Sequence, residues 1–325
     1  MPKKFNVVVV TGPTATGKTA LAVELARRWN GEVISADSRQ VYQHLDIGSG
    51  KDLQEYGEIP YHLIDIVPPG GRSYHLKQFT VDARNAIRDI DARGKLPVIC
   101  GGSALYIHAL LKNYTLPGDA PDEEERRIID ATPLAELQKE LQRLDPEFYA
   151  SFADRDNFNR VRRAVEIRRR PSPGEVPDME LNALVLGVLF PRSVVHERIE
   201  ARLDARLNAG LIEEVTDLHD KYGMSWDALE FLGLEYRCVA EYLQGRCEYE
   251  EMRFKLLCQI RQFAKRQDIF FRKMEREGID IYWLPEGDRG AADRLIAAFV
   301  NGKELPEPEF RLKDFINSGV RVRKR

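Results

Sequence analysis

Eight residues close to the N-terminus have the types and the spacing of a phosphate-binding loop. They directly follow the apolar run 5–10, so a buried strand is expected to end where the loop begins. Glycines in such a loop let the backbone turn tightly, and the amide N–H groups then point at a phosphate held at the start of a helix. Lys18 adds a positive charge, and the Thr19 hydroxyl can be a ligand of Mg²⁺. The residues predicted to hold a diphosphate or a triphosphate are Gly12, Pro13, Thr14, Ala15, Thr16, Gly17, Lys18 and Thr19.

Two further polar side chains follow apolar runs that also have the character of strands. Asp37 comes after the run 32–36, and Ser103 comes after the run 96–100 and two glycines. A carboxylate at a strand end beside a phosphate loop can bind Mg²⁺ or accept a proton from a substrate, but Asp is also a favoured helix N-cap. The Ser103 hydroxyl could donate to a phosphate oxygen or to a departing oxygen. These residue types alone leave both roles of Asp37 open.

The elements that must position these residues alternate along the first third of the chain. Short apolar runs predict strands at 7–10, 32–36, 62–67, 96–100 and, later, 183–190, while helical patterns cover 18–30 and 77–93. Such alternation predicts an α/β fold, a parallel sheet wrapped by helices, with ligands at the carboxyl ends of the strands. The phosphate loop, Asp37 and Ser103 are all expected at that edge.

The pattern changes at about Leu116, and a run of charged helical sequence then begins at Asp122 and continues to Ile167. We therefore predict a P-loop catalytic core made of residues 1–115 and 179–285, with a smaller all-helical insertion domain at 116–178. Residues 286–325 are expected to form a C-terminal extension that ends in a basic tail.

The composition is that of an ordinary soluble protein: 43% of the 325 residues are hydrophobic and 31% are charged. A net charge of −3 argues against a surface that is basic throughout, so local basic clusters carry more information about nucleic-acid binding. No apolar stretch approaches the ~20 residues of a membrane helix, and no signal region precedes the first strand. We expect a cytoplasmic monomer with no membrane partner. The four cysteines lack C-x-x-C spacing, which favours reduced thiols.

Taken together, the motifs resemble those of the tRNA dimethylallyltransferase family, also called tRNA isopentenyltransferases, of the bacterial type. The resemblance extends from residue 6 to about residue 285. The blocks that carry it are the phosphate loop and the segments 37–42, 45–48, 62–65, 101–106, 160–166, 198–202 and 261–267.

This resemblance implies a specific reaction. Family members transfer a dimethylallyl group from dimethylallyl diphosphate to N6 of the adenosine adjacent to the tRNA anticodon on its 3′ side, and release diphosphate. Carbon is attacked rather than phosphorus, so the phosphate loop, Lys18 and Mg²⁺ would stabilise a departing diphosphate. By the same resemblance Asp37 is the base for the N6 proton, Ser103 donates to the bridging oxygen, and Arg202 closes over the diphosphate.

The resemblance also implies contacts to the anticodon stem-loop of tRNA, which the helical insertion would grip by shape and by its phosphates. Near the target base these contacts involve Asp37, Ser38, Arg39, Gln40 and Ser103. Further basic contacts are expected at Arg160, Arg162, Arg163, Arg261, Lys265 and Arg266.

The chain departs from the family pattern at Arg155-Asp156-Asn157, Arg168–Gly174, Glu235 and Ile260, all in segments near the expected RNA contacts. Two other functions therefore stay open. An adenine-nucleotide prenyltransferase acting on AMP, ADP or ATP would not need the insertion. A P-loop nucleotide kinase or an ATPase would need a strand carboxylate for Mg²⁺, for which Asp65 is the candidate.

Overall fold

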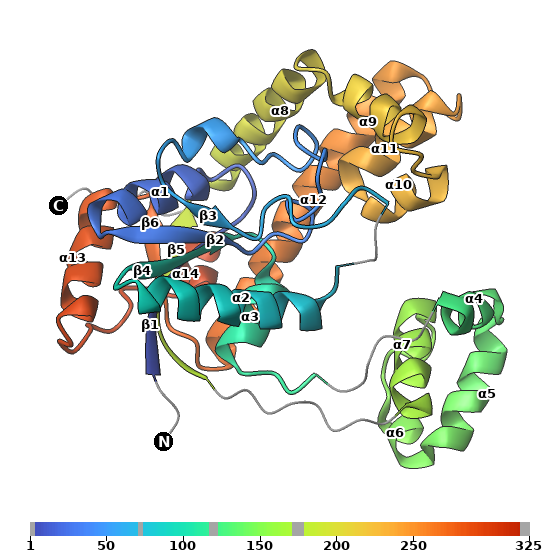
Figure 1. Cartoon of the computed structure of the whole chain (residues 1–325), viewed down its shortest axis with the longest axis horizontal. Helices are drawn as coiled ribbons and strands as arrows, with labels where there is room; N and C mark the ends of the chain where they lie inside the picture. Colours follow the sequence, from blue (N-terminus) through green and yellow to red (C-terminus); the bar gives the residue numbers. More distant parts are fainter. Residues whose placement is uncertain (1–3, 71–73, 117–122, 171–178, 319–325) are drawn as a thin grey trace. The chain divides into compact units, whose positions relative to one another are not determined.

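The computed structural model describes residues 4–70, 74–116, 123–170 and 179–318 (Figure 1). The chain forms two compact units. The larger unit is Met1–Lys112 together with Met179–Arg325, and the smaller unit is Asn113–Asp178. The smaller unit is therefore inserted between two strands of the larger one.

The larger unit is built on a parallel sheet, as the sequence predicts. Its strand order is β3-β2-β4-β1-β5-β6, so β1, which leads into the phosphate loop, lies in the middle. The strand order reverses beside β1, and in open parallel sheets ligands bind in the crevice at such a point. The strands are β1 (Lys4–Thr11), β2 (Gly31–Ser35), β3 (Tyr61–His62), β4 (Leu96–Gly101), β5 (Glu180–Leu189) and β6 (Ile281–Pro285).

Helices precede and follow these strands through both units. In the larger unit they are α1 (Lys18–Arg28), the 3₁₀ turn η1 (Leu53–Glu55), α2 (Leu76–Ala92), α3 (Ala104–Leu111), α8 (Arg192–Asn208), α9 (Leu211–Asp220), α10 (Trp226–Leu232), α11 (Leu234–Leu243), α12 (Tyr249–Arg276), α13 (Arg289–Val300) and α14 (Leu312–Ser318). In the smaller unit they are α4 (Glu123–Ala131), α5 (Leu134–Leu144), α6 (Pro146–Ser151) and α7 (Phe158–Arg169).

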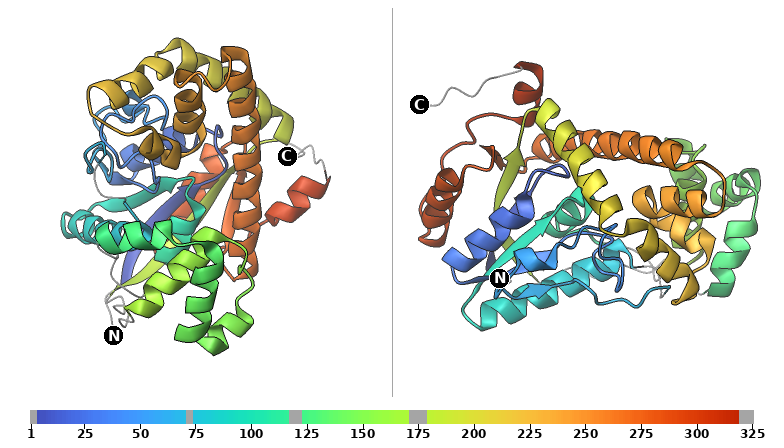
Figure 2. Two further views of the ribbon diagram at one scale, coloured as in Figure 1. Left: turned by 90° about the vertical axis from the view of Figure 1, so that its right-hand side faces the viewer. Right: turned by 90° about the horizontal axis from the view of Figure 1, so that it is seen from above.

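Both faces of the sheet are buried, which explains why its strands read as continuous apolar runs. Along β1, Val7 and Val9 pack in one core with α2, α3 and α12, whereas Val8 and Val10 pack in the other with α1 and α13 (Figure 1). The 28-residue helix α12, the long orange helix of Figure 2, contacts α11, α8, α3 and α14. It therefore links the helices α9–α11 to the sheet.

Two expectations from the sequence need correction. The strand expected at 62–67 ends at His62, because Leu63 and Asp65 have φ angles of 64° and 57°, which no strand accommodates. The expected extension beyond residue 285 is part of the larger unit through α14: α13 buries Ile296 and Phe299 against the sheet, and α14 buries Leu312. The basic tail at 319–325 lies outside the described residues.

The smaller unit has a hydrophobic core of its own. Ile129, Leu137, Leu141, Val161 and Val165 are fully buried, and they come from α4, α5 and α7. The unit is helical throughout its described part, as the sequence predicts. In neither unit do the described residues include a helix long and apolar enough to cross a membrane.

Candidate active site

The phosphate loop has the backbone shape that its glycines predict. Gly12 has a φ of 148°, and a Cβ there would lie 2.6 Å from the carbonyl oxygen of Val188, so only glycine fits between β1 and β5. Gly17, with a φ of 76°, turns the chain into α1. The Thr16 hydroxyl donates to the Pro13 carbonyl at 2.9 Å and closes the loop. The loop is thus preformed at the carboxyl end of the central strand.

Lys18 stands in this loop as a cation that is poorly solvated. Its ammonium donates to the Pro13 carbonyl at 3.3 Å. Burial lowers the pKa of Lys18, the charges of Arg202 and Arg206 lower it further, and the charge of Asp37 opposes them. Three cations therefore lie close to one another beside the phosphate loop, an arrangement that an anionic ligand would stabilise.

A buried glutamine of α12 joins the phosphate loop to the turn after β4. Gln267 accepts the backbone N–H of Thr14 at 2.9 Å through Oε1, and donates through Nε2 to the Gly102 carbonyl at 2.8 Å. It is 5% exposed. The sequence analysis gives this residue no role, because a polar residue inside a helix carries no signal of the distant backbone that it will meet.

Asp37 and Ser103 follow the neighbouring strands β2 and β4 at the same edge of the sheet. The backbone N–H of Ser38 donates to Ser103 Oγ at 3.3 Å, and Asp37 Oδ1 accepts the N–H of Arg39 at 2.8 Å. Residues 38–41 form a turn rather than a helix, so Asp37 is not a helix N-cap. Its carboxylate is held by a local turn and belongs to the same edge of the sheet as the phosphate loop.

Gln40, a predicted contact to the target nucleotide, has its amide engaged within the protein. Its Oε1 accepts the Ser35 hydroxyl at 2.8 Å, and its Nε2 donates to the Gly50 carbonyl at 3.0 Å. Gln40 therefore ties the end of β2 to the loop at 46–52.

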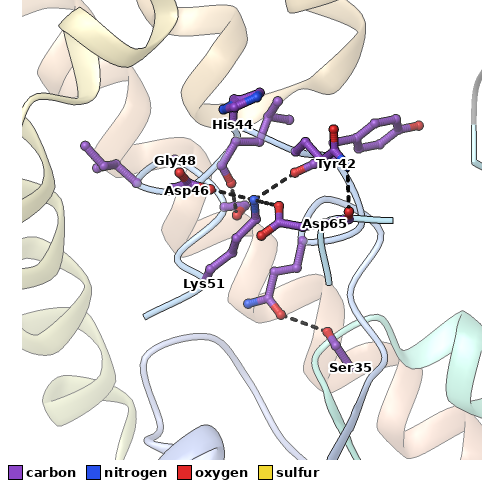
Figure 3. A network of polar contacts seen from close by, with 12 residues as sticks. Ser35, Tyr42, His44, Asp46, Gly48, Lys51 and Asp65 are labelled. Atoms are coloured by element: carbon purple, nitrogen blue, oxygen red, sulfur yellow. Dashed lines mark hydrogen bonds and ion pairs between the residues drawn. The ribbon is translucent and has the colours of Figure 1, made fainter. Parts of the chain in front are cut away.

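A buried lysine holds the same loop from the inside (Figure 3). Lys51 is 1% exposed, and its ammonium donates to the Tyr42 carbonyl at 2.8 Å, to Asp46 at 2.6 Å and to the carboxylate of Asp65. A buried ammonium needs such partners to offset its desolvation. Asp65, the carboxylate considered for a kinase Mg²⁺ site, thus has a structural role as the partner of Lys51.

Arg202 lies beside the phosphate loop. It lines a small cavity of about 20 Å³ together with Thr14 and Ala15. Its guanidinium pairs with Asp52 at 2.5 Å, a partner that the sequence analysis does not identify. The cradle predicted for the diphosphate therefore has the phosphate loop on one wall and α8 on another.

The remaining predicted basic residues fall into two groups. On α12, Arg261 pairs with Glu200 at 2.9 Å. Arg261 and Lys265 both line a second cavity of about 870 Å³, which Pro13 also lines. Arg266 is exposed. In the smaller unit, α7 carries the other three. Arg162 pairs with Asp130, Arg163 pairs with Glu166, and Arg160 lies 3.9 Å from Asp154. The first group belongs to the larger unit and the second to the smaller unit.

Thr19, in the first turn of α1, could hold a Mg²⁺ ion that is bound mainly by phosphate oxygens. The described residues contain no cluster of three or more His, Cys, Asp or Glu side chains that could hold a metal ion. Burial raises the pKa of the neighbouring Cys100 to about 11, so this thiol is protonated at neutral pH. Mg²⁺ typically keeps several waters and binds phosphate oxygens with few protein ligands, which the Thr19 hydroxyl beside the loop would satisfy.

Comparison with known proteins shows which family this chain resembles. A family model described as "IPP transferase" matches residues 40–274, and one described as "Isopentenyl transferase" matches residues 5–58. The chain is 47% identical to tRNA dimethylallyltransferase 1 of Syntrophus aciditrophicus, over 87% of this chain and 94% of that protein. For tRNA dimethylallyltransferase 1 of Geotalea daltonii the identity is 44%, over 90% and 94% of the two chains.

A solved structure shows the same likeness. The tRNA isopentenylpyrophosphate transferase of Bacillus halodurans superposes with a TM-score of 0.68 at 32% identity, over 92% of this chain and 98% of that one. The family model covers most of the chain, and the matching relatives are covered almost completely. The chain therefore belongs to the IPP transferase family, among relatives named tRNA dimethylallyltransferases.

Proposed function

We propose that this protein transfers the dimethylallyl group of dimethylallyl diphosphate to N6 of the adenosine adjacent to the tRNA anticodon on its 3′ side, with release of diphosphate. The observation that carries the proposal is the contact of Ser103 with the turn that follows Asp37, at one edge of the sheet beside a phosphate loop, in a chain of this family. A base, a hydrogen-bond donor and an anion cradle are the groups that this alkyl transfer needs.

The cradle acts on the leaving group. As the bond from carbon to oxygen breaks, negative charge builds on the diphosphate, and the loop amides, Lys18 and Arg202 stabilise that charge. Because the charge grows toward the transition state, these contacts strengthen as the reaction proceeds and so raise the rate as well as the affinity. The lowered pKa of Lys18, caused first by burial, supports this role, since an arriving anion would relieve an unfavourable charge.

Asp37 acts on the nucleophile. The lone pair of an adenine N6 is delocalised into the ring, so loss of the N6 proton to a base assists its attack on carbon. The turn at Arg39 fixes the Asp37 carboxylate through Oδ1 and leaves acceptor capacity for that proton. Ser103 accepts the N–H of Ser38, which leaves its own hydroxyl hydrogen to donate to the bridging oxygen.

Mg²⁺ is the expected cofactor. The Thr19 hydroxyl would hold it beside the diphosphate, and when bound it supplies positive charge to the diphosphate oxygens. The residues of the chain then bind the diphosphate, orient its bridging oxygen and hold the proton of the adenine.

The RNA contacts follow from the basic residues in both units. The smaller unit, with Arg160, Arg162 and Arg163, would bind the anticodon stem-loop through its shape and phosphates. Arg261, Lys265 and Arg266 add positive charge along α12. Extrusion of the target adenosine from the loop costs a few kcal/mol, which contacts to the flipped base must offset.

A transfer assay with three acceptors tests the proposal. Purified protein, Mg²⁺ and radiolabelled dimethylallyl diphosphate are incubated with an anticodon stem-loop, with AMP or with ADP. We expect label in the stem-loop alone. Transfer to AMP or ADP instead would support the adenine-nucleotide prenyltransferase. In a parallel incubation with ATP, turnover of ATP without any prenyl transfer would support a kinase or an ATPase.

A further inference from the structure

A second arginine of α8 faces the same cavity as Arg202. Arg206 follows Arg202 by four residues, so both side chains lie on one face of the helix, and both line the small cavity beside Thr14 and Ala15. The charge of Arg206 also contributes to the lowered pKa of Lys18, after burial and Arg202. Arg206 is therefore near the phosphate loop both in geometry and in electrostatics.

The guanidinium of Arg206 is held by two acceptors outside the phosphate loop. Its Nη1 lies 3.2 Å from Glu235 Oε1 and 3.2 Å from the carbonyl oxygen of Gly48. The side chains of Arg206 and Glu235 are only 15% and 13% exposed, and Glu235 lines the same cavity. Burying an ion pair costs the desolvation of both charges, so this pair contributes little to the stability of the fold. The two contacts that orient Arg206 therefore point to a role in the site.

The loop at 46–52 is shaped around both guanidinium groups. At Gly50, where φ is 64°, a Cβ would lie 1.7 Å from Arg206 Nη2 and 2.6 Å from Arg202 Nη2. The two arginines therefore pack against bare backbone. The carbonyl of Gly50 accepts the Gln40 amide, so the position of this backbone is fixed from the other side.

We propose that Arg206 is a second diphosphate-binding arginine beside Arg202, and that Glu235 is the positioning residue that aims it at the phosphate loop. The inference deepens the proposed function, because the ligand of this arginine is the diphosphate of the prenyl donor. With Lys18 and Arg202, Arg206 supplies a third positive charge for a ligand that carries about three negative charges. A planar guanidinium can also contact two phosphate oxygens at once.

A matched control lies on the same helix, α8. Arg253 of α12 forms a two-point ion pair with Asp204 of α8, with distances of 2.7 and 2.8 Å, and it lies outside the residues that line the cavity. Replacing Arg253 removes an arginine–carboxylate pair at α8 without touching the cradle. Any general effect of losing such a pair will therefore appear in Arg253→Met.

The test is the affinity for inorganic pyrophosphate in the presence of Mg²⁺, measured by calorimetry on the full-length protein. We expect Arg206→Met to weaken binding about 10- to 100-fold, the usual effect of losing a charged hydrogen bond, and Arg206→Lys to weaken it less. Arg253→Met should bind as the unmodified protein does. In steady-state kinetics, Arg206→Met should raise the KM for dimethylallyl diphosphate and leave the KM for the stem-loop unchanged.

The positioning role of Glu235 is tested by asking whether its effect on pyrophosphate binding depends on Arg206. We expect Glu235→Gln to weaken pyrophosphate binding by less than Arg206→Met does, and the double variant to bind like Arg206→Met alone, because a positioning residue acts only through its partner. A further loss in the double variant would overturn the role given to Glu235. Rescue of affinity by Glu235→Asp relative to Glu235→Gln would support it.

Two results would overturn the proposal for Arg206 itself. One is unchanged pyrophosphate affinity in Arg206→Met or, should that variant not fold, in Arg206→Lys. The other is an equal loss in Arg253→Met. Pyrophosphate binding can be measured without prenyl transfer, so the two proposals can fail separately. If Arg206→Met loses pyrophosphate affinity but the unmodified protein transfers no dimethylallyl group, the proposed function is contradicted and the inference about Arg206 stands.

Discussion

Gln267, in α12, accepts the backbone N–H of Thr14 in the phosphate loop at 2.9 Å, across 253 residues of sequence. Its amide also donates to the Gly102 carbonyl next to Ser103. A single side chain thus sets the spacing between the cradle proposed for the diphosphate and the hydroxyl proposed to act on its bridging oxygen.

We therefore expect Gln267→Leu to damage both the site and the fold. Leucine has a similar size but leaves the Thr14 N–H and the Gly102 carbonyl without their partner, which costs about 1–3 kcal/mol for each buried group left unpaired. Thermal unfolding and pyrophosphate titration measure the two effects. Loss of pyrophosphate affinity together with a clear fall in Tm is expected, whereas unchanged affinity would show that the clamp does not shape the loop.

Asp37→Asn removes the proposed base but keeps the hydrogen bond that forms its turn. The asparagine oxygen can still accept the Arg39 N–H, but the neutral amide cannot take the N6 proton. We expect kcat for stem-loop modification to fall about 10²- to 10⁴-fold. Pyrophosphate should bind at least as well, because a negative charge that acts on Lys18 is removed. Activity near that of the unmodified protein would rule out Asp37 as the base.

Lys18→Met should stabilise the empty protein. The pKa of Lys18 is lowered in the fold, chiefly by burial, so between that lowered pKa and the usual 10.5 the unfolded chain binds more protons than the folded one. Stability therefore rises with pH across this window, and at neutral pH the charged Lys18 destabilises the fold. We expect a higher Tm for Lys18→Met at pH 7, a difference that shrinks as pH approaches 10.5, and loss of pyrophosphate binding.

Lys221 provides the contrast for this experiment. It is an exposed lysine whose pKa is raised by a hydrogen bond to Asp217, so its replacement by Met should not raise the Tm. Equal increases in Tm for both variants would mean that a general loss of positive charge, rather than the buried position of Lys18, causes the effect.

Gly50→Ala tests whether the loop at 46–52 shapes the cradle. A Cβ at this residue meets the ends of Arg202 and Arg206, which are flexible enough to move away. Gly57 is the control, because it also has a positive φ, of 53°, but its nearest neighbour to a Cβ is 3.7 Å away. Both alanine variants should lose about 1–2 kcal/mol of stability to the left-handed backbone. Only Gly50→Ala should weaken pyrophosphate binding.

The parts of the site that the sequence predicts are those with a local signal. The phosphate loop follows an apolar strand and contains its own glycines, so its position and shape can be inferred from neighbouring residues. Parallel-sheet alternation then predicts that Asp37 and Ser103 lie at the same edge, and both follow strands that are neighbours in the sheet. Each of these inferences needs only short segments and the rule that ligands bind at strand ends.

The parts that escape prediction depend on contacts between distant segments. Three such contacts involve polar side chains whose sequence pattern gives no indication of their partners. They are those of Gln267, of the Arg206–Glu235 pair and of the buried Lys51. The prediction of a strand at 62–67 is wrong for a different reason. Its apolar residues satisfy the strand pattern, but Lys51 holds Asp65 in a turn with positive φ, and this tertiary contact overrides the local preference.

The central claim is that the phosphate loop holds a diphosphate that departs intact. The most direct test uses dimethylallyl diphosphate labelled with ¹⁸O at the oxygen between carbon and phosphorus, with the anticodon stem-loop as acceptor. Because the bond from carbon to oxygen is the one expected to break, all the label should be found in the released diphosphate by ³¹P NMR. Label retained in dimethylallyl alcohol, with the diphosphoryl group transferred to an acceptor, would contradict the account, as would label retained in dimethylallyl phosphate with only the terminal phosphoryl group transferred.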